Sequence, residues 1–317
     1  MAGDEHEAQA VGGAAGAGAS VDASGAPAAG GASVADGASA GNGASAGNGA
    51  SDVLLSVCDV RCGYGKKHPV EIVHGVSFDV HAGEFVCIIG ANGCGKTTTL
   101  KSVMGLLPLL GGSVAFEGAE VARMGEQERA RHFAYIPQAH TPPFPFTVAD
   151  VVMMGRTPYV NLLARTTRRD REVAMEALEL LGITHLAHTD YTSLSGGQQQ
   201  LVLIARALTQ ESDILVMDEP TAALDFGNQQ LVLSRMHMLS RMGKSVVMVT
   251  HDPDHALFCA DKVVVMDEGR VLQEGTADEC ITTEVLRRIY NAEAYVMDVQ
   301  VPTGQTVRAC VPLNVAR

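Results

Sequence analysis

The segment from Gly90 to Thr97 constrains the fold of this chain more than any other feature of its sequence. It consists of GANGCGKT and lies between a nearly continuous apolar run, Glu84–Ile89, and a segment of helical character, Thr97–Met104. Such an apolar run is typical of a strand buried on both faces. The glycines allow backbone N–H groups to turn inward around phosphate oxygens at the start of the following helix. The segment therefore predicts a strand–loop–helix unit that binds phosphate.

Within this loop, the side chains of Lys96 and Thr97 suit the chemistry of a bound nucleoside triphosphate. We expect Lys96 to reach the β- and γ-phosphates and the Thr97 hydroxyl to ligate Mg²⁺. The expected nucleotide-contacting residues of this segment are Gly90, Ala91, Asn92, Gly93, Cys94, Gly95, Lys96, Thr97 and Thr98.

A second apolar run, Ile214–Met217, ends in the acidic pair Asp218 and Glu219. In a parallel sheet this strand delivers Asp218 beside the phosphate loop, where it can hold Mg²⁺ through water. Glu219 is placed to orient or deprotonate an attacking water. An acidic pair at the end of a strand is usually only solvated, so this interpretation depends on the phosphate loop upstream.

The segment Leu194–Gln198, LSGGQ, opens a predicted helix, with Ser195 lying 23 residues before Asp218. Ser195 and the amides of Gly196 and Gly197 form a second helix N-terminus suited to phosphate. A single chain does not need two such sites for one nucleotide. Taken alone, the motif would be a serine cap ahead of an ordinary helix. In this order with the phosphate loop and the acidic pair, however, it resembles the signature of the ABC ATPase family.

The resemblance implies that ATP is the nucleotide and that Mg²⁺ accompanies it. In ABC ATPases two chains enclose two ATP molecules head to tail, so the signature of one chain completes the site of the other. Ser195, Gly196, Gly197 and Gln198 are therefore expected to contact the ATP that a second copy holds.

The resemblance extends over roughly residues 53–290 and assigns four further positions. Tyr64 matches the aromatic residue that stacks on adenine, and Asp225 lies in the loop that crosses the dimer. Gln138 matches the glutamine that touches Mg²⁺ and water, and His251 matches the histidine that contacts the γ-phosphate. The catalytic residues implied are Glu219, His251 and Gln138, and the Mg²⁺ ligands implied are Thr97, Gln138 and Asp218.

Short apolar strands alternate with helices after residue 193, which predicts a parallel sheet covered on both faces. Residues 147–188 instead show helical periodicity alone. The resemblance implies an α/β fold, with a P-loop NTPase (RecA-like) core, an antiparallel β subdomain and an inserted helical subdomain. The expected divisions are a tail at 1–52, the first part of the core at 53–141, the helical subdomain at 142–192, the second part of the core at 193–291 and a short β extension at 292–317.

The first 51 residues contain 18 Ala, 13 Gly and 6 Ser, which predicts a flexible tail with almost nothing to bury. Residues 1–52 carry six acidic side chains and no Lys or Arg, and the whole chain has a formal net charge of −13. Neither part has the basic surplus that binding to a phosphate backbone requires. With no Trp and 4% aromatic residues, base stacking is also disfavoured. We therefore expect no nucleic-acid partner.

No apolar run approaches the ~20 residues needed to span a bilayer, and the N-terminus lacks the pattern of a signal peptide. We therefore expect a soluble protein made in the cytoplasm. Its seven Cys do not indicate a disulfide scaffold, and Cys58 and Cys62 fit a strand better than a zinc site. The resemblance implies attachment to the cytoplasmic face of the membrane through separate permease subunits. A second copy of the chain is a direct partner, and a substrate-binding protein is an indirect one.

Within transporters, Tyr135–Arg156 resembles the branch that imports iron(III)-siderophores, haem and cobalamin. Leu286–Tyr290 and the strand-like Ala294–Val301 resemble the C-terminal end of that branch. Three alternatives stay open: an importer of molybdate or another metal species, a non-transport ABC ATPase acting on DNA or the ribosome, and an unrelated P-loop kinase or GTPase. The cargo never touches this chain, so the sequence does not specify it directly.

Overall fold

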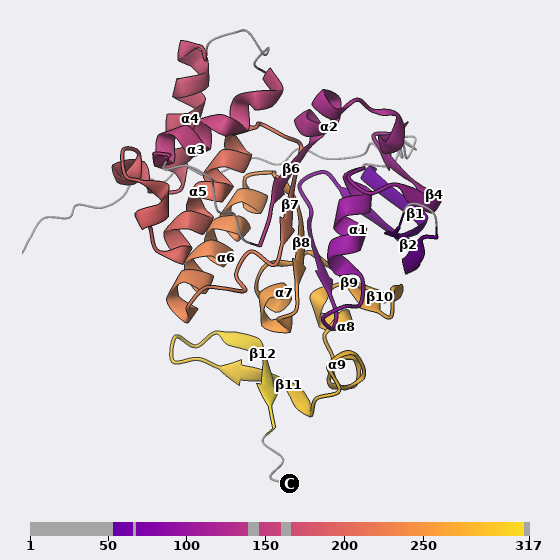
Figure 1. Cartoon of the computed structure of the whole chain (residues 1–317). Helices are drawn as coiled ribbons and strands as arrows, with labels where there is room; N and C mark the ends of the chain where they lie inside the picture. Colours follow the sequence, from indigo (N-terminus) through magenta and orange to yellow (C-terminus); the bar gives the residue numbers. More distant parts are fainter. Residues whose placement is uncertain (1–52, 66–67, 139–145, 160–165, 314–317) are drawn as a thin grey trace, which may run out of the picture. The chain divides into compact units, whose positions relative to one another are not determined.

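The computed structural model describes residues 53–65, 68–138, 146–159 and 166–313, which belong to a compact unit formed by residues 50–317. The expected tail at 1–52 lies outside the described residues. At the centre is a six-stranded sheet in the order β10-β9-β3-β8-β7-β6, in which only β10 pairs antiparallel (Figure 1). Its strands are β3 (Phe85–Ile89), β6 (Phe133–Ile136), β7 (Ile214–Asp218), β8 (Ser245–Thr250), β9 (Lys262–Asp267) and β10 (Arg270–Gly275).

The central strands are apolar throughout because each of their faces contributes to a different core. Along β3, Phe85, Cys87 and Ile89 pack into a core shared with helices that follow later in the chain. The intervening Val86 and Ile88 pack into a second core with α1 (Lys96–Val103) and the antiparallel sheet. Burial on both faces is what the continuous apolar pattern predicts for a parallel sheet, and the α/β fold is confirmed.

The first core is covered by helices α5 (Gly196–Thr209), α6 (Phe226–Arg241) and α7 (Pro253–Cys259). On the other side, the antiparallel sheet has the order β2-β1-β4-β5. Its strands are β1 (Val53–Tyr64), β2 (Val70–His81), β4 (Leu109–Phe116) and β5 (Ala119–Glu120). Cys58 and Cys62 both lie on β1, as expected for a strand pair. The described residues contain no His, Cys, Asp and Glu cluster able to hold a metal.

The inserted helical region contains α3 (Val148–Met153), α4 (Arg168–Leu180) and the short turns Met154–Tyr159 and Thr184–Leu186. Arg156 fixes this region to the end of α5: its Nε donates to Asp170 Oδ1 at 2.9 Å and its Nη1 donates to the Thr209 carbonyl at 2.9 Å. The expected boundaries of the subdomains stay predictions, and the Pro-rich residues 139–145 lie outside the described ranges.

Several elements were not predicted from the sequence: α2 (Glu126–His132), β10, α8 (Ala277–Cys280) and the second strand of a C-terminal hairpin. The hairpin pairs β11 (Ala294–Gln300) with β12 (Thr306–Pro312) and follows helix α9 (Thr283–Tyr290). Every helix in the described ranges is too short or too polar to cross a membrane.

Candidate nucleotide-binding site

The phosphate loop connects the end of β3 to the start of α1, and two of its glycines are required by geometry. A Cβ on Gly90 would lie 2.3 Å from the Met266 carbonyl oxygen, so no larger residue fits there. Gly95 precedes α1 in a left-handed conformation with φ +101°, which glycine adopts without steric cost. This turn leaves the first N–H groups of α1 pointing into the loop, as phosphate binding needs.

Lys96 supplies a buried positive charge at this loop. Only 5% of its surface is exposed, and its ammonium donates to the carbonyl oxygens of Gly90 at 2.7 Å and Ala91 at 2.9 Å. Its Nζ also lies 3.9 Å from Glu219 Oε1. A small cavity of about 150 Å³ adjoins these groups. It is lined by Ile72, Asn92, Gly93, Gly95, Lys96, Thr97, Thr98 and Glu219.

The Thr97 hydroxyl and the Asp218 carboxylate meet at the side of the loop. Thr97 Oγ1 donates to Asp218 Oδ1 at 2.8 Å, and the Tyr135 hydroxyl donates to Asp218 Oδ2 at 3.2 Å. Burial, together with the charge of Asp218, raises the pKa of Tyr135 well above its usual value, so this hydroxyl stays a donor. A hydroxyl and a carboxylate are hard oxygen ligands of the kind that Mg²⁺ binds beside substrate phosphates and water. The residues present therefore fit Mg²⁺.

Glu219 and His251 approach each other from the ends of two adjacent parallel strands. Glu219 Oε2 lies 3.3 Å from His251 Nδ1, and the Glu219 N–H donates to the Val249 carbonyl at 3.0 Å. Glu219 has a positive φ of +47°, which is uncommon for a residue other than glycine and costs free energy. The bond from Glu219 to Val249 continues the pairing of β7 with β8, and the Glu219 carboxylate lies between Lys96 and His251.

The signature residues occupy the start of α5 and do not line the cavity beside Lys96. Ser195 and Gln198 satisfy each other, because the Ser195 N–H donates to Gln198 Oε1 at 3.1 Å and the Gln198 N–H donates to Ser195 Oγ at 3.4 Å. Gly196 and Gly197 form the first positions of the helix. The chain therefore presents two phosphate-type helix N-termini that are separate in the described structure.

Asp225 lies beside the signature and outside the cavity lining. Its carboxylate accepts hydrogen bonds from the backbone N–H and the side-chain amide of Asn228, each at 2.9 Å, and so caps α6. Asn228 in turn packs against Gly197, where a Cβ would lie only 2.2 Å from Asn228 Oδ1.

The other two predicted positions are exposed, and only Tyr64 has a contact with the phosphate-loop segment. Tyr64 is 48% exposed, and its hydroxyl is 3.4 Å from the Thr98 Oγ1. Gln138 is exposed and follows β6 at the end of the described range 68–138.

His255 is a buried residue that the sequence analysis did not identify. Its Nδ1 lies 3.1 Å from Thr250 Oγ1 and 3.4 Å from Thr221 Oγ1, and its Nε2 lies 3.4 Å from Asp252 Oδ2. Burial lowers the pKa of His255, which favours the neutral ring. His255 thus joins the segment after Glu219 to the segment that carries His251. The one sequence signal that could have identified His255 was its position four residues after His251.

Comparisons with known proteins agree with this geometry. A family model described as ABC transporter matches residues 73–222. The hemin import ATP-binding protein of Nocardia farcinica is 40% identical over 238 residues, covering 74% of this chain and 81% of that protein. The chain belongs to the ABC transporter family. The ABC ATPase assignment, with ATP as the nucleotide, is thereby confirmed, and the kinase or GTPase alternative is excluded.

Further relatives of this ABC ATPase have different named cargoes. The ferric enterobactin transport ATP-binding protein of Escherichia coli K12 is 34% identical over 252 residues, covering 77% of this chain and 92% of that protein. The molybdate import ATP-binding protein of Haemophilus influenzae is 34% identical over 226 residues, covering 71% and 84%. Among solved structures, an inward-facing metal-chelate type ABC transporter gives a TM-score of 0.73 at 31% identity, covering 83% of this chain and 98% of that chain.

Proposed function

We propose that this ABC ATPase hydrolyses ATP between two copies of itself and thereby powers an importer of an iron(III)-siderophore, haem or cobalamin. The proposal that two copies share each ATP rests on one observation. Two phosphate-type helix N-termini lie apart from each other within one chain. The cavity beside Lys96 contains Glu219 but none of the signature residues. A head-to-tail pair of chains would bring Ser195 of one copy to the phosphates held by the other, giving each nucleotide both helix N-termini.

In this mechanism each residue around the cavity has a separate role. Lys96 and the N–H groups of the loop neutralise and position the β- and γ-phosphates, and Tyr64 stacks on adenine. Thr97, Asp218 and Gln138 would hold Mg²⁺, which when bound would offset the charge of the phosphate oxygens. Glu219 orients the attacking water and accepts its proton. His251 holds the Glu219 carboxylate and contacts the γ-phosphate, which couples hydrolysis to the position of the β8 end.

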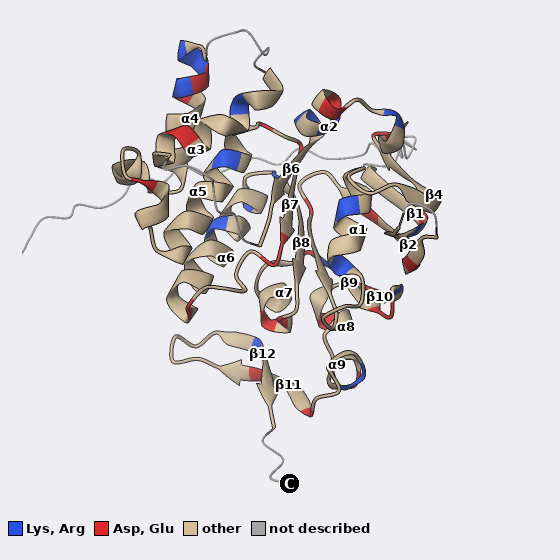
Figure 2. Ribbon diagram, viewed as in Figure 1, with Lys and Arg blue, Asp and Glu red and all other residues tan. Residues whose placement is uncertain are grey.

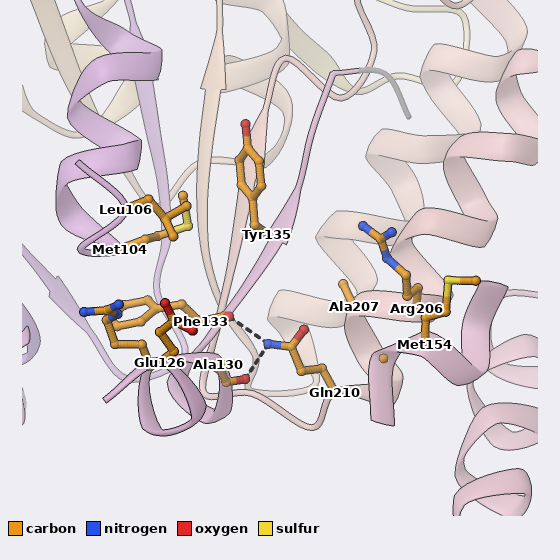
Figure 3. Close-up of a pocket in the computed structure, with 12 residues that line it drawn as sticks. Met104, Leu106, Glu126, Ala130, Phe133, Tyr135, Met154, Arg206, Ala207 and Gln210 are labelled. Atoms are coloured by element: carbon orange, nitrogen blue, oxygen red, sulfur yellow. Dashed lines mark hydrogen bonds between the residues drawn. The ribbon is translucent and has the colours of Figure 1, made fainter. Parts of the chain in front are cut away.

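A second, larger cavity fits contact with the membrane subunits. It has a volume of about 510 Å³ and lies between the core and the helical region (Figure 3). Met104 and Leu106 border it on one side, and Met154 and Arg206 border it on the other. The lining also includes Tyr135, whose hydroxyl donates to Asp218. A cytoplasmic segment of a permease seated here would therefore contact a residue that touches the proposed Mg²⁺ site, and the chain would lie on the cytoplasmic face of the membrane.

The cargo is tested by uptake measurements in cells that lack the gene. Labelled ferric siderophore, haem, cobalamin and molybdate are supplied in turn, with the wild-type chain or the Glu219→Gln variant restored. We expect loss of iron-chelate, haem or cobalamin uptake, with rescue by the wild type alone. The molybdate relative makes molybdate the second candidate. Loss of molybdate uptake alone would overturn the proposed cargo and leave the ATPase intact, whereas unchanged uptake of all four would overturn the importer assignment.

A further inference from the structure

The C-terminal hairpin has one face that is fixed to the protein and one that leaves large apolar side chains partly exposed. Residues alternate between these faces along a strand, and the register pairs Tyr295 with Val311, Met297 with Ala309, and Val299 with Val307. These six residues share one side, which we call the outer hairpin face. Five of them are large apolar residues that are 37–50% exposed.

The opposite side of the hairpin is held by specific contacts. Val296 and Cys310 pack against the first core, and the Cys310 N–H donates to Asp254 Oδ1 on α7 at 2.8 Å. Arg308 contacts Asp278 and Asp298 at 2.7 Å and 3.2 Å. The hairpin is therefore fixed in position, and its outer face is an apolar surface held in place.

The side chains of the outer hairpin face limit which kinds of partner could cover it. It carries no charged side chain, and the charges of the hairpin, Asp298 and Arg308, pair with each other on the opposite side (Figure 2). An anionic lipid surface would be matched by Lys and Arg, which this face lacks. Residues 1–52 contain no Leu, Ile, Phe or Tyr with which to fill it. The cavity proposed for the permease borders Met154, in the turn after α3, and α3 lies at the other end of the described structure from the hairpin (Figure 1).

A second copy of the chain meets these requirements. The hairpin rests on α7, and α7 begins two residues after His251, so the hairpin adjoins the side of the molecule that holds the nucleotide. A two-fold axis brings identical surfaces together, which suits an uncharged apolar face. We propose that the outer hairpin face contacts the same face of the second copy in the ATP-bound pair. This inference rests on the proposed function.

The size of the face determines how it would act. Stable dimers bury about 800 Å² per partner, and a patch of this kind offers only a few hundred Å². It therefore does not hold two copies together alone and instead strengthens the contact that ATP creates.

The test measures self-association of the full chain in the Glu219→Gln background with MgATP, by sedimentation velocity over a range of protein concentrations. Met297→Lys places a like charge from each copy at the contact, and we expect the dimer dissociation constant to rise at least about tenfold. Val307→Lys, on the other strand, should have the same effect. Met242→Lys is the matched control, because Met242 is 61% exposed at the end of α6, and it should leave the constant within about twofold.

ATP binding and the melting temperature of each variant establish that it is folded, and Met297→Leu should restore the dimer. Unchanged association of both lysine variants would overturn the inference while leaving the proposed function intact. If the lysine variants lose the permease from detergent-solubilised transporter while their self-association is unchanged, the face belongs to the contact with the membrane subunit. That result would also overturn the inference. A Glu219→Gln parent that stays monomeric with MgATP would overturn the proposed function and the inference together.

Discussion

Replacing Gly197 by Ala tests the contact between the signature and the segment that carries Asp225. The new Cβ would lie 2.2 Å from Asn228 Oδ1, so the Asn228 side chain must move and its 2.9 Å hydrogen bond to Asp225 is lost. Forcing an extra methyl group into a packed site costs ~1–3 kcal/mol. A lost hydrogen bond to a carboxylate costs ~1.5–3 kcal/mol. Because alanine favours a helix by up to ~1 kcal/mol, we expect a net loss of roughly 3 kcal/mol.

Gly196→Ala is the control, since its Cβ would lie at an ordinary 3.4 Å from Leu224. Thermal unfolding of the nucleotide-free protein should show Gly197→Ala melting about 6–12 °C below the wild type. Gly196→Ala should melt within about 2 °C of it. In an Asn228→Ala background, which removes the obstructing side chain, the cost of Gly197→Ala should largely vanish. Equal costs in both backgrounds, or at both glycines, would refute the reasoning.

Three further predictions concern the phosphate loop, the helical region and the tail. Lys96→Ala removes the buried ammonium and should abolish hydrolysis and greatly weaken ATP binding, measured by titration; wild-type affinity would contradict the loop assignment. Asp170→Asn removes one of the two carboxylates that pair with the buried guanidinium of Arg156, the other being Glu211, and should cost ~1.5–3 kcal/mol in urea unfolding. Because hydrogen bonds from Thr167 and the charge of Arg156 lower the pKa of Asp170, its stabilising effect should be complete above about pH 4 and be lost as pH falls further. This acid-dependent loss should be absent in Asp170→Asn. Deletion of residues 1–51 should leave ATPase activity and melting temperature nearly unchanged, and a large loss of either would contradict the predicted flexible tail.

The sequence predicted the parts of the fold that have local signals. The apolar runs at Glu84–Ile89 and Ile214–Met217 predicted buried parallel strands, and the glycine spacing around Lys96 predicted the loop between a strand and a helix. Thr97 and Asp218 are 121 residues apart in the sequence. Their proximity followed from the rule that the carboxyl ends of parallel strands lie at the same edge of the sheet.

The remainder depends on contacts that no local pattern records. Thr306–Pro312 lacks clean alternation because Arg308 faces the protein and pairs with Asp278, so the second strand received no bounds of its own within the β extension expected at 292–317. His255 acts through hydroxyls from two separate segments, which only the folded chain brings together. Gln198 was predicted to contact nucleotide, which stays a prediction, and in the structure its side chain caps its own helix. The sequence pattern is the same whether these residues bind a ligand or cap the helix, so the sequence does not distinguish the two roles.

The central claim is that Ser195 of one copy completes the nucleotide site of another. It is tested most directly by adding Ser195→Arg to the Glu219→Gln variant and measuring sedimentation with MgATP. Each chain should still bind ATP with the affinity of its parent, because Ser195 does not line its own cavity. The parent should sediment as a dimer with one ATP per chain, and the double variant as a monomer. A double variant that dimerises like its parent, or that loses ATP binding as a monomer, would contradict the account.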